Sequence, residues 1–176
     1  MAELTDNPAV AVGAVDQLVA ARGEPAWLAD ERRAALRTFE ATPWPGPRDE
    51  LWRYTQLERF SVAGLDLVPG PQTDEVSERI ERRIRDSDAE GVLVVKNGRP
   101  VKREARIKEA GVIFTDLATA LREHEDLVRQ HLYTAVNAPM TKYTALNSAL
   151  WTGGTFVYVP KDVEVELPLG TITTAD

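Results

Sequence analysis

The chain has 176 residues, of which 43% are hydrophobic and 28% charged, with 21 Lys and Arg against 28 Asp and Glu and a net charge of −7. This size allows one medium domain, or a small domain joined to part of another, and excludes a multi-domain enzyme of ordinary size. The acidic balance argues against a nucleic-acid partner, and the lack of cysteine excludes disulfides, thiolate nucleophiles and cysteine-held metals or clusters in this chain.

The start of the chain lacks the pattern of a secretory signal, because its first cationic residue is Arg22 and its first apolar stretch ends at Asp16. The longest uncharged span, residues 143–160, contains Asn147, Ser148 and a pair of glycines, which would cost too much inside a membrane helix. We therefore expect a cytoplasmic protein with no membrane partner.

An amphipathic surface helix is predicted directly after Glu24 and Pro25. Apolar residues recur there at helical spacing, and we assign the charged residues to the remaining, exposed surface. The apolar set is Leu28, Ala35, Leu36 and Phe39, and the charged set is Asp30, Glu31, Arg32, Arg33 and Arg37. A turn rich in proline and aromatic residues then ends the helix, with Pro43, Pro45, Gly46 and Pro47 beside Trp44, Leu51, Trp52 and Tyr54.

A second helix is predicted from Thr73, a good N-cap, with Val76, Ile80 and Ile84 on its buried side. Its other side offers Glu–Arg pairs at i,i+4 spacing, a pattern typical of a solvated surface. These pairs are Glu75 with Arg79, Glu78 with Arg82, and Glu81 with Arg85.

A β-hairpin is predicted next, with Val92 to Val95 and a strand from Val101 joined through Asn97-Gly98, two residues that accept positive φ. Pro100 marks an edge or a strand end. A short strand at Gly111 to Phe114 then leads into a third helix, which Thr115 or Asp116 caps. The apolar side of that helix holds Leu117, Leu121, Val128 and Leu132.

The last part of the chain begins with a short helix near Tyr143, followed by Gly153-Gly154, for which we expect a turn with positive φ. Strands are predicted at 155–159 and 163–167, the second from the alternation of Val163, Val165 and Leu167 with glutamates. Residues 171–176 are also strand-like, so a sheet starts here without being finished. The fold class is α+β, with a helical region at 1–60, an α+β region with hairpin and helix at 61–140, and the start of a further β structure at 141–176.

Two groups of residues invite a chemical role, and both have a simpler explanation. His124 and His131 share a helix face about 10 Å apart, whereas two ligands of one metal on a helix need i,i+4 spacing. Asp49-Glu50 lies between Arg48 and Arg53, where local pairing explains the carboxylates better than acid–base catalysis. With no nucleotide-binding glycine loop and no G-x-S-x-G elbow, we assign no catalytic, cofactor-binding or metal-binding residue.

A basic run surrounds the hairpin, and it is either a docking site for an acidic partner or, as we favour, a solvated strand edge protected by charge. It consists of Lys96, Arg99, Lys102, Arg103, Arg106 and Lys108. Trp44, Trp52 and Trp151 are interpreted as core residues in preference to partner anchors.

The string from Ala145 to Leu169, ALNSALWTGGTFVYVPKDVEVELPL, resembles the opening of the β-helix in the SufB/SufD family of iron-sulfur cluster assembly proteins. Residues 111–117, the following helix with His124, and the string PRDELWRYT at 47–55 resemble the family's N-terminal region, and the last favours the SufD branch. The resemblance covers most of the chain from about Pro25.

The resemblance implies a cytosolic, non-catalytic scaffold subunit that works with a SufB- or SufD-type partner and the ATPase SufC. In the family, the cluster-related Cys and His residues and the SufC-docking domain lie in the C-terminal part, so no ligand is carried over and no cofactor is expected here. The chain is then an N-terminal fragment with a truncated β-helix, and its unfinished sheet at 155–175 should either self-associate or be disordered.

Two other readings stay open on the sequence alone. One is a free-standing protein–protein interaction module without a cluster role, and the other is a small carboxylate enzyme such as a cupin-like β protein. A metal-dependent cupin needs several clustered histidines, and this chain has only two. If the scaffold interpretation holds, the natural reading frame continues well beyond Asp176.

Overall fold

The computed structural model describes residues 12–46, 48–55, 73–137 and 140–174. The chain divides into two compact units, each assembled from two stretches of sequence. The first unit comprises residues 1–70 and 132–150, and the second comprises residues 71–131 and 151–176. The mixture of helices with small sheets confirms the α+β class, while the three predicted regions 1–60, 61–140 and 141–176 stay predictions.

Helices build the first unit: α1 (Val12–Arg22), α2 (Ala26–Ala41), the one-turn η1 (Glu50–Trp52) and α6 (Lys142–Leu150). As predicted, α2 begins after Pro25 and ends just before Pro43, and all four of its predicted apolar residues are buried. It packs against α1 and α6. The core they enclose consists of Val15, Ala35, Leu36, Phe39, Ala145, Ala149 and Leu150.

One residue of α2 overturns its assignment to the exposed surface. Arg32 is fully buried, with 0% of its surface exposed. It lies four residues after Leu28 and three before Ala35, so helical spacing puts its side chain on the apolar face. Its charge is compensated there by Glu24, whose side chain is itself only 3% exposed.

A three-stranded sheet forms the centre of the second unit, in the order β2-β1-β5. The hairpin of β1 (Gly91–Lys96) and β2 (Arg99–Ala105) turns through Asn97 and Gly98 at φ of 48° and 80°, which confirms the prediction. Strand β5 (Leu169–Thr174) runs parallel to β1 in the register Gly91↔Leu169 to Lys96↔Thr174.

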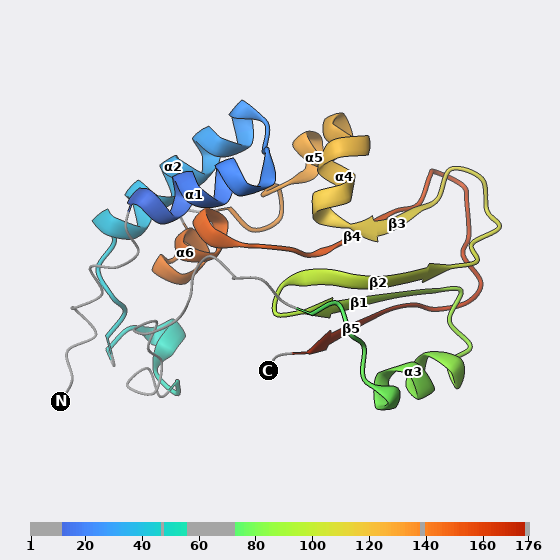
Figure 1. Ribbon diagram of the computed structural model, residues 1–176. Helices are drawn as coiled ribbons and strands as arrows, with labels where there is room; N and C mark the ends of the chain where they lie inside the picture. Colours follow the sequence, from blue (N-terminus) through green and yellow to red (C-terminus); the bar gives the residue numbers. More distant parts are fainter. Residues whose placement is uncertain (1–11, 47, 56–72, 138–139, 175–176) are drawn as a thin grey trace. The chain divides into compact units, whose positions relative to one another are not determined.

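Both faces of β1 are buried, as a continuous apolar run in a central strand requires. On one face Val92 and Val94 pack against Ile84 of α3 (Glu78–Arg85). On the other, Leu93 and Val95 pack against Phe114 of β3 (Ile113–Asp116), which pairs antiparallel with β4 (Thr155–Tyr158). Figure 1 shows the sheet between α3 on one side and β3 with β4 on the other.

Two helix predictions need correction. Helix α3 begins at Glu78 after Ser77, not at Thr73, because residues 73–77 are exposed apart from a half-buried Val76, and a helical turn without packing is marginal. The predicted third helix is two helices, α4 (Leu117–Glu123) and α5 (Glu125–His131), separated at His124, whose φ is −138°. Asp116 is the N-cap of α4, since its carboxylate accepts a hydrogen bond from the Thr119 N–H at 2.9 Å.

The strand predicted at 163–167 is also absent, because this stretch pairs with no strand among the described residues. It lies between Pro160 and Pro168, which lack N–H donors, and it follows a turn in which Asp162 has φ of 63°. The predicted alternation of buried and exposed side chains holds only in part. Val163 and Val165 are half-buried, but Leu167 is 45% exposed. The strand instead starts at Leu169.

Gly153 serves close packing and not the predicted positive φ, since neither it nor Gly154 is among the described glycines with positive φ. A Cβ on Gly153 would overlap the carbonyl oxygen of Gly98 at the hairpin turn. Glycine is therefore required here because another part of the backbone approaches closely.

Candidate interaction surfaces

The two histidines are not placed on one helix face as predicted. His124 is the residue that separates α4 from α5, and His131 is the last residue of α5. Within the described ranges, no group of three or more His, Cys, Asp or Glu side chains could hold a metal ion.

Asp49 and Glu50 make short-range contacts at the start of η1. The Asp49 carboxylate accepts a hydrogen bond from the Gly46 N–H at 2.7 Å, and Glu50 lies 3.6 Å from the Arg53 guanidinium. Both side chains of the Glu50–Arg53 pair are more than half exposed. These contacts fix the turn after α2, and they do not bring the two carboxylates to a shared substrate position.

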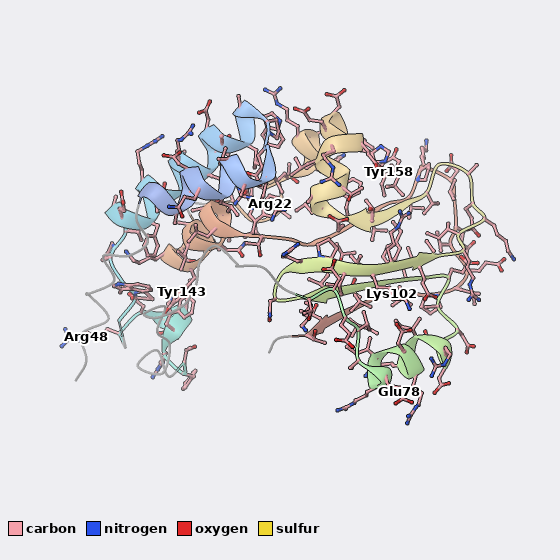
Figure 2. The ribbon with its side chains drawn as sticks, viewed as in Figure 1. Arg22, Arg48, Glu78, Lys102, Tyr143 and Tyr158 are labelled. Atoms are coloured by element: carbon pink, nitrogen blue, oxygen red, sulfur yellow. The ribbon has the colours of Figure 1, made fainter. Side chains whose placement is uncertain are left out.

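Four aromatic side chains gather where the turn after α2 meets the start of α6, and we call them the aromatic corner: Phe39, Trp44, Trp52 and Tyr143. The Trp44 ring lies edge-on to Phe39 at 5.7 Å and to Tyr143 at 5.6 Å between centroids. Trp52 lies 4.7 Å from Tyr143, a residue labelled in Figure 2. Trp44 and Trp52 thus pack within the first unit, while Leu51 and Tyr54 beside them are 84% and 90% exposed.

Lys142 ties the aromatic corner to the end of α2. Its ammonium donates hydrogen bonds to the carbonyl oxygens of Phe39 and Thr42, both at 2.6 Å. These carbonyls belong to the last turn of α2 and its cap, where the helix leaves acceptors unsatisfied and where the helix dipole favours a cation. The ammonium also lies 4.2 Å from the Phe39 ring centroid and 4.9 Å from that of Trp44.

We expect Lys142→Met to lower the free energy of unfolding by about 1.5–3 kcal/mol, because both carbonyls lose a charged donor inside a largely buried site. Burial lowers the pKa of the Lys142 amine, with Glu40 acting weakly in the other direction. The unfolded chain therefore binds more protons than the folded one at alkaline pH below the ordinary value of 10.5, and the wild type gains stability as pH rises there. The neutral amine still has two N–H groups for the two carbonyls.

Urea unfolding at several pH values, followed by circular dichroism, measures both effects. The difference between wild type and Lys142→Met should widen as pH rises through the alkaline range. Lys108→Met, at an exposed position, is the matched control and should change stability by less than about 0.5 kcal/mol at any pH. Equal effects of the two substitutions would contradict the role assigned to Lys142.

Half of the basic run, Arg99, Lys102 and Arg103, lies on β2, which is an edge strand of its sheet. Lys102, labelled in Figure 2, reaches α3 and contacts Glu81 at 2.6 Å, and it also lies 3.0 Å from Glu104. Hydrogen bonds to these two carboxylates, that to Glu81 first, raise the pKa of Lys102. Part of the run is therefore used to fasten α3 to the sheet, and Glu81 pairs with Lys102 in place of the predicted Arg85.

The opposite edge of this sheet and the neighbouring β4 are open on their outer sides in the described part of the chain. Among the described residues, β5 pairs only with β1, and β4 pairs only with β3. The two are linked by a hydrogen bond between the hydroxyls of Thr155 and Thr171 at 2.8 Å. Exposed apolar side chains lie on or just after β4, with Val157 47% and Val159 39% exposed. Open backbone groups next to apolar surface are what a further strand would cover.

Sequence reasoning assigned no role to Glu24 and Lys142 and misplaced Arg32. Arg32 and Lys142 were detectable by helical spacing, whereas Glu24 lies outside α2 and was not. Lys142 lies three residues before Ala145 and seven before Ala149, so it shares the buried face of α6. No helix among the described residues is long and apolar enough to cross a membrane.

The geometry defines an α+β region with open strand edges in its described part and a basic run beside the edge strand β2. Comparison with known proteins gives the family: the model of the SufBD protein N-terminal region matches residues 16–170. The chain therefore belongs to the SufBD family, which confirms the resemblance seen in the sequence.

Similar proteins are named as iron-sulfur cluster assembly proteins. The iron-sulfur cluster assembly protein SufD of Bacillus subtilis is 35% identical over 153 residues, which cover 83% of this chain and 34% of that protein. An iron-sulfur cluster assembly SufBD family protein of Staphylococcus epidermidis is 35% identical over 169 residues, covering 88% and 36%. One of Staphylococcus haemolyticus is 36% identical over 163 residues, covering 83% and 34%. The chain thus spans about a third of the length of these relatives.

Proposed function

We propose that this chain is the N-terminal part of a SufD-like scaffold subunit that acts in iron-sulfur cluster assembly. The observation that carries the proposal is the family match over residues 16–170, together with the SufD name of the Bacillus subtilis relative. The whole subunit would work in the cytoplasm with a SufB-type partner and the ATPase SufC. This part of it would hold no cofactor and catalyse no reaction, in keeping with the lack of cysteine in the chain.

We further propose that β4 and β5 open a β-helix. Three observations support this: the parallel pairing of β5 with β1, the open outer edges of β4 and β5, and the exposed Val157 and Val159. In a solenoid each rung is stabilised by the next, so a following rung would cover this surface. When it is missing, the same residues, 155–175, would pair with another copy of the chain, which light scattering during size exclusion would reveal.

The experiment that tests the function is to read the gene downstream of codon 176 and to purify its tagged product from its own cells. We expect a longer frame with many short strands, a helical end and late Cys or His residues. The product should bring down a SufB-type subunit and SufC in stoichiometric amounts, whereas a tagged unrelated cytoplasmic protein should not. A frame that stops at Asp176, or a long product without these partners, would favour a free-standing interaction module.

A further inference from the structure

Positive charge is concentrated in one segment of an otherwise acidic chain. Residues 78–109 contain ten Lys and Arg against seven Asp and Glu, so the remainder has eleven cationic and 21 anionic residues. The segment has a net charge of +3 and the rest −10. It lies entirely within the second unit and comprises α3, β1 and β2. A partner that is attracted by charge to this chain at this segment must itself be acidic there.

Helix α3 presents the sharpest part of this charge. Arg79, Arg82 and Arg83 line a shallow, wide-open groove of about 460 Å³, together with Asp86 and Ser87 just after the helix. All three arginines are exposed. Because Ile84 and Lys102 hold the other side of α3 against the sheet, the groove has a fixed wall.

The charges in the groove are poorly compensated. Arg82 has a 3.4 Å contact with Glu78, but both side chains are more than 60% exposed, and such pairs stabilise little. Glu81, the nearest other carboxylate on α3, is held by Lys102. Arg79 and Arg83 have no ion-pair or hydrogen-bond partner among the described residues. They are four residues apart, a spacing at which like charges repel on a helix.

We propose that this groove binds an acidic, extended segment of a partner protein through the carboxylates of that segment. Guanidinium groups bind carboxylates with two parallel hydrogen bonds. Four helical residues separate Arg79 from Arg83 by about 6 Å along the axis, and carboxylates two residues apart on an extended strand are separated by about 6.6 Å. A segment with acidic residues at alternate positions therefore matches both arginines at once.

The remaining lining residues favour a peptide over a nucleic acid. The Asp86 carboxylate is a possible acceptor for the backbone N–H groups of a peptide, whereas a nucleic-acid backbone has no such donors and places a negative charge at every step. No aromatic side chain lines the groove, so bases have no stacking platform there. This inference goes beyond the proposed function and does not depend on it, because α3 and the two residues after it form the groove.

The test is fluorescence anisotropy of the 176-residue chain with a labelled peptide of five Glu-Ser repeats, at low ionic strength. We expect saturable binding that weakens as salt is added and is absent for a peptide of five Gln-Ser repeats. Arg79→Glu combined with Arg83→Glu should weaken binding by roughly tenfold or more, since two charged contacts are reversed. Arg79→Gln with Arg83→Gln should weaken it less, and circular dichroism verifies that each variant is folded.

The matched control is Arg99→Glu with Lys108→Glu, which makes the same change in net charge at exposed positions of the same segment outside the groove. It should change the affinity by less than about threefold, as expected for distant screened charges. Equal weakening in the two charge-reversal variants would overturn the proposal, as would no binding of the Glu-Ser peptide. Tighter binding of a single-stranded RNA oligonucleotide than of the peptide would overturn it in favour of a nucleic-acid surface.

Discussion

Replacing Arg32 with alanine should lower the free energy of unfolding by about 3–5 kcal/mol, because the substitution leaves a buried carboxylate without its main partner. The Arg32 guanidinium binds both carboxylate oxygens of Glu24, at 2.6 and 2.8 Å, and donates a third hydrogen bond to the Ala149 carbonyl at 3.0 Å. The loss therefore affects two places at once: the turn before α2 and the end of α6. Urea unfolding followed by circular dichroism measures it.

Arg33 provides the matched control, because it is the next residue on α2 and its ion pair is exposed. It lies 2.9 Å from Asp16, and the two side chains are 44% and 52% exposed. Arg33→Ala should cost less than about 1 kcal/mol. A second variant, Arg32→Met with Glu24→Gln, removes both charges and should recover a large part of the loss. If Arg32→Ala were no worse than Arg33→Ala, the buried pair would not stabilise the first unit.

Arg32 also shows where sequence reasoning fails for a physical reason. The prediction assigned Arg32 to the surface with the other charged residues, since a charged side chain is rarely buried without a partner. The partner here is Glu24, eight residues away and on the other side of Pro25, which helical spacing within α2 does not reveal. The position of Arg32 on α2 does indicate that it lies on the buried face. For this residue, helical periodicity therefore predicted burial better than charge did.

Local elements were predictable because short-range chemistry determines them. Asn97-Gly98 sets the hairpin turn, and Asp116 caps α4, each through contacts within a few residues. The pairing of β5 with β1 joins residues more than 70 positions apart in sequence, and nothing in either strand specifies that neighbour. The strand predicted at 163–167 failed for the same reason, since alternation indicates a half-buried extended chain and not a hydrogen-bonded partner.

The surfaces of the chain were predictable in part. The basic run was visible in the sequence. The sequence did not show which of its residues is held in an ion pair, because Lys102 binds Glu81, which lies 21 positions away. That contact removes Glu81 from the arginine face of α3, so the hairpin lysine indirectly leaves the groove arginines less compensated. The electrostatics of the groove therefore depend on tertiary structure, while its residue types are already present in the string RIERRIR.

The second large effect is expected for Phe114→Ala, which should lower the free energy of unfolding by about 3–5 kcal/mol. Phe114 is 1% exposed, and it fills the space between β3 and the central strand, against Leu93 and Val95. The packing is tight, since a Cβ on Gly91 would lie 2.7 Å from the Phe114 ring. Leu93, Val95 and Leu169 around Phe114 belong to hydrogen-bonded strands, so they cannot collapse fully into the cavity that alanine would leave.

Val157→Ala is the control for Phe114→Ala, because Val157 is the cross-strand register partner of Phe114 but is 47% exposed. The substitution Val157→Ala also lowers the strand propensity at this position. We expect it to lower the free energy of unfolding by no more than about 1 kcal/mol, since it leaves no enclosed cavity. Urea unfolding gives both free energies, and amide exchange along β1 locates the effect of Phe114→Ala in the strand that contains Leu93. Equal losses for the two variants would mean that β3–β4 pairing, and not the burial of Phe114, stabilises this side of the sheet.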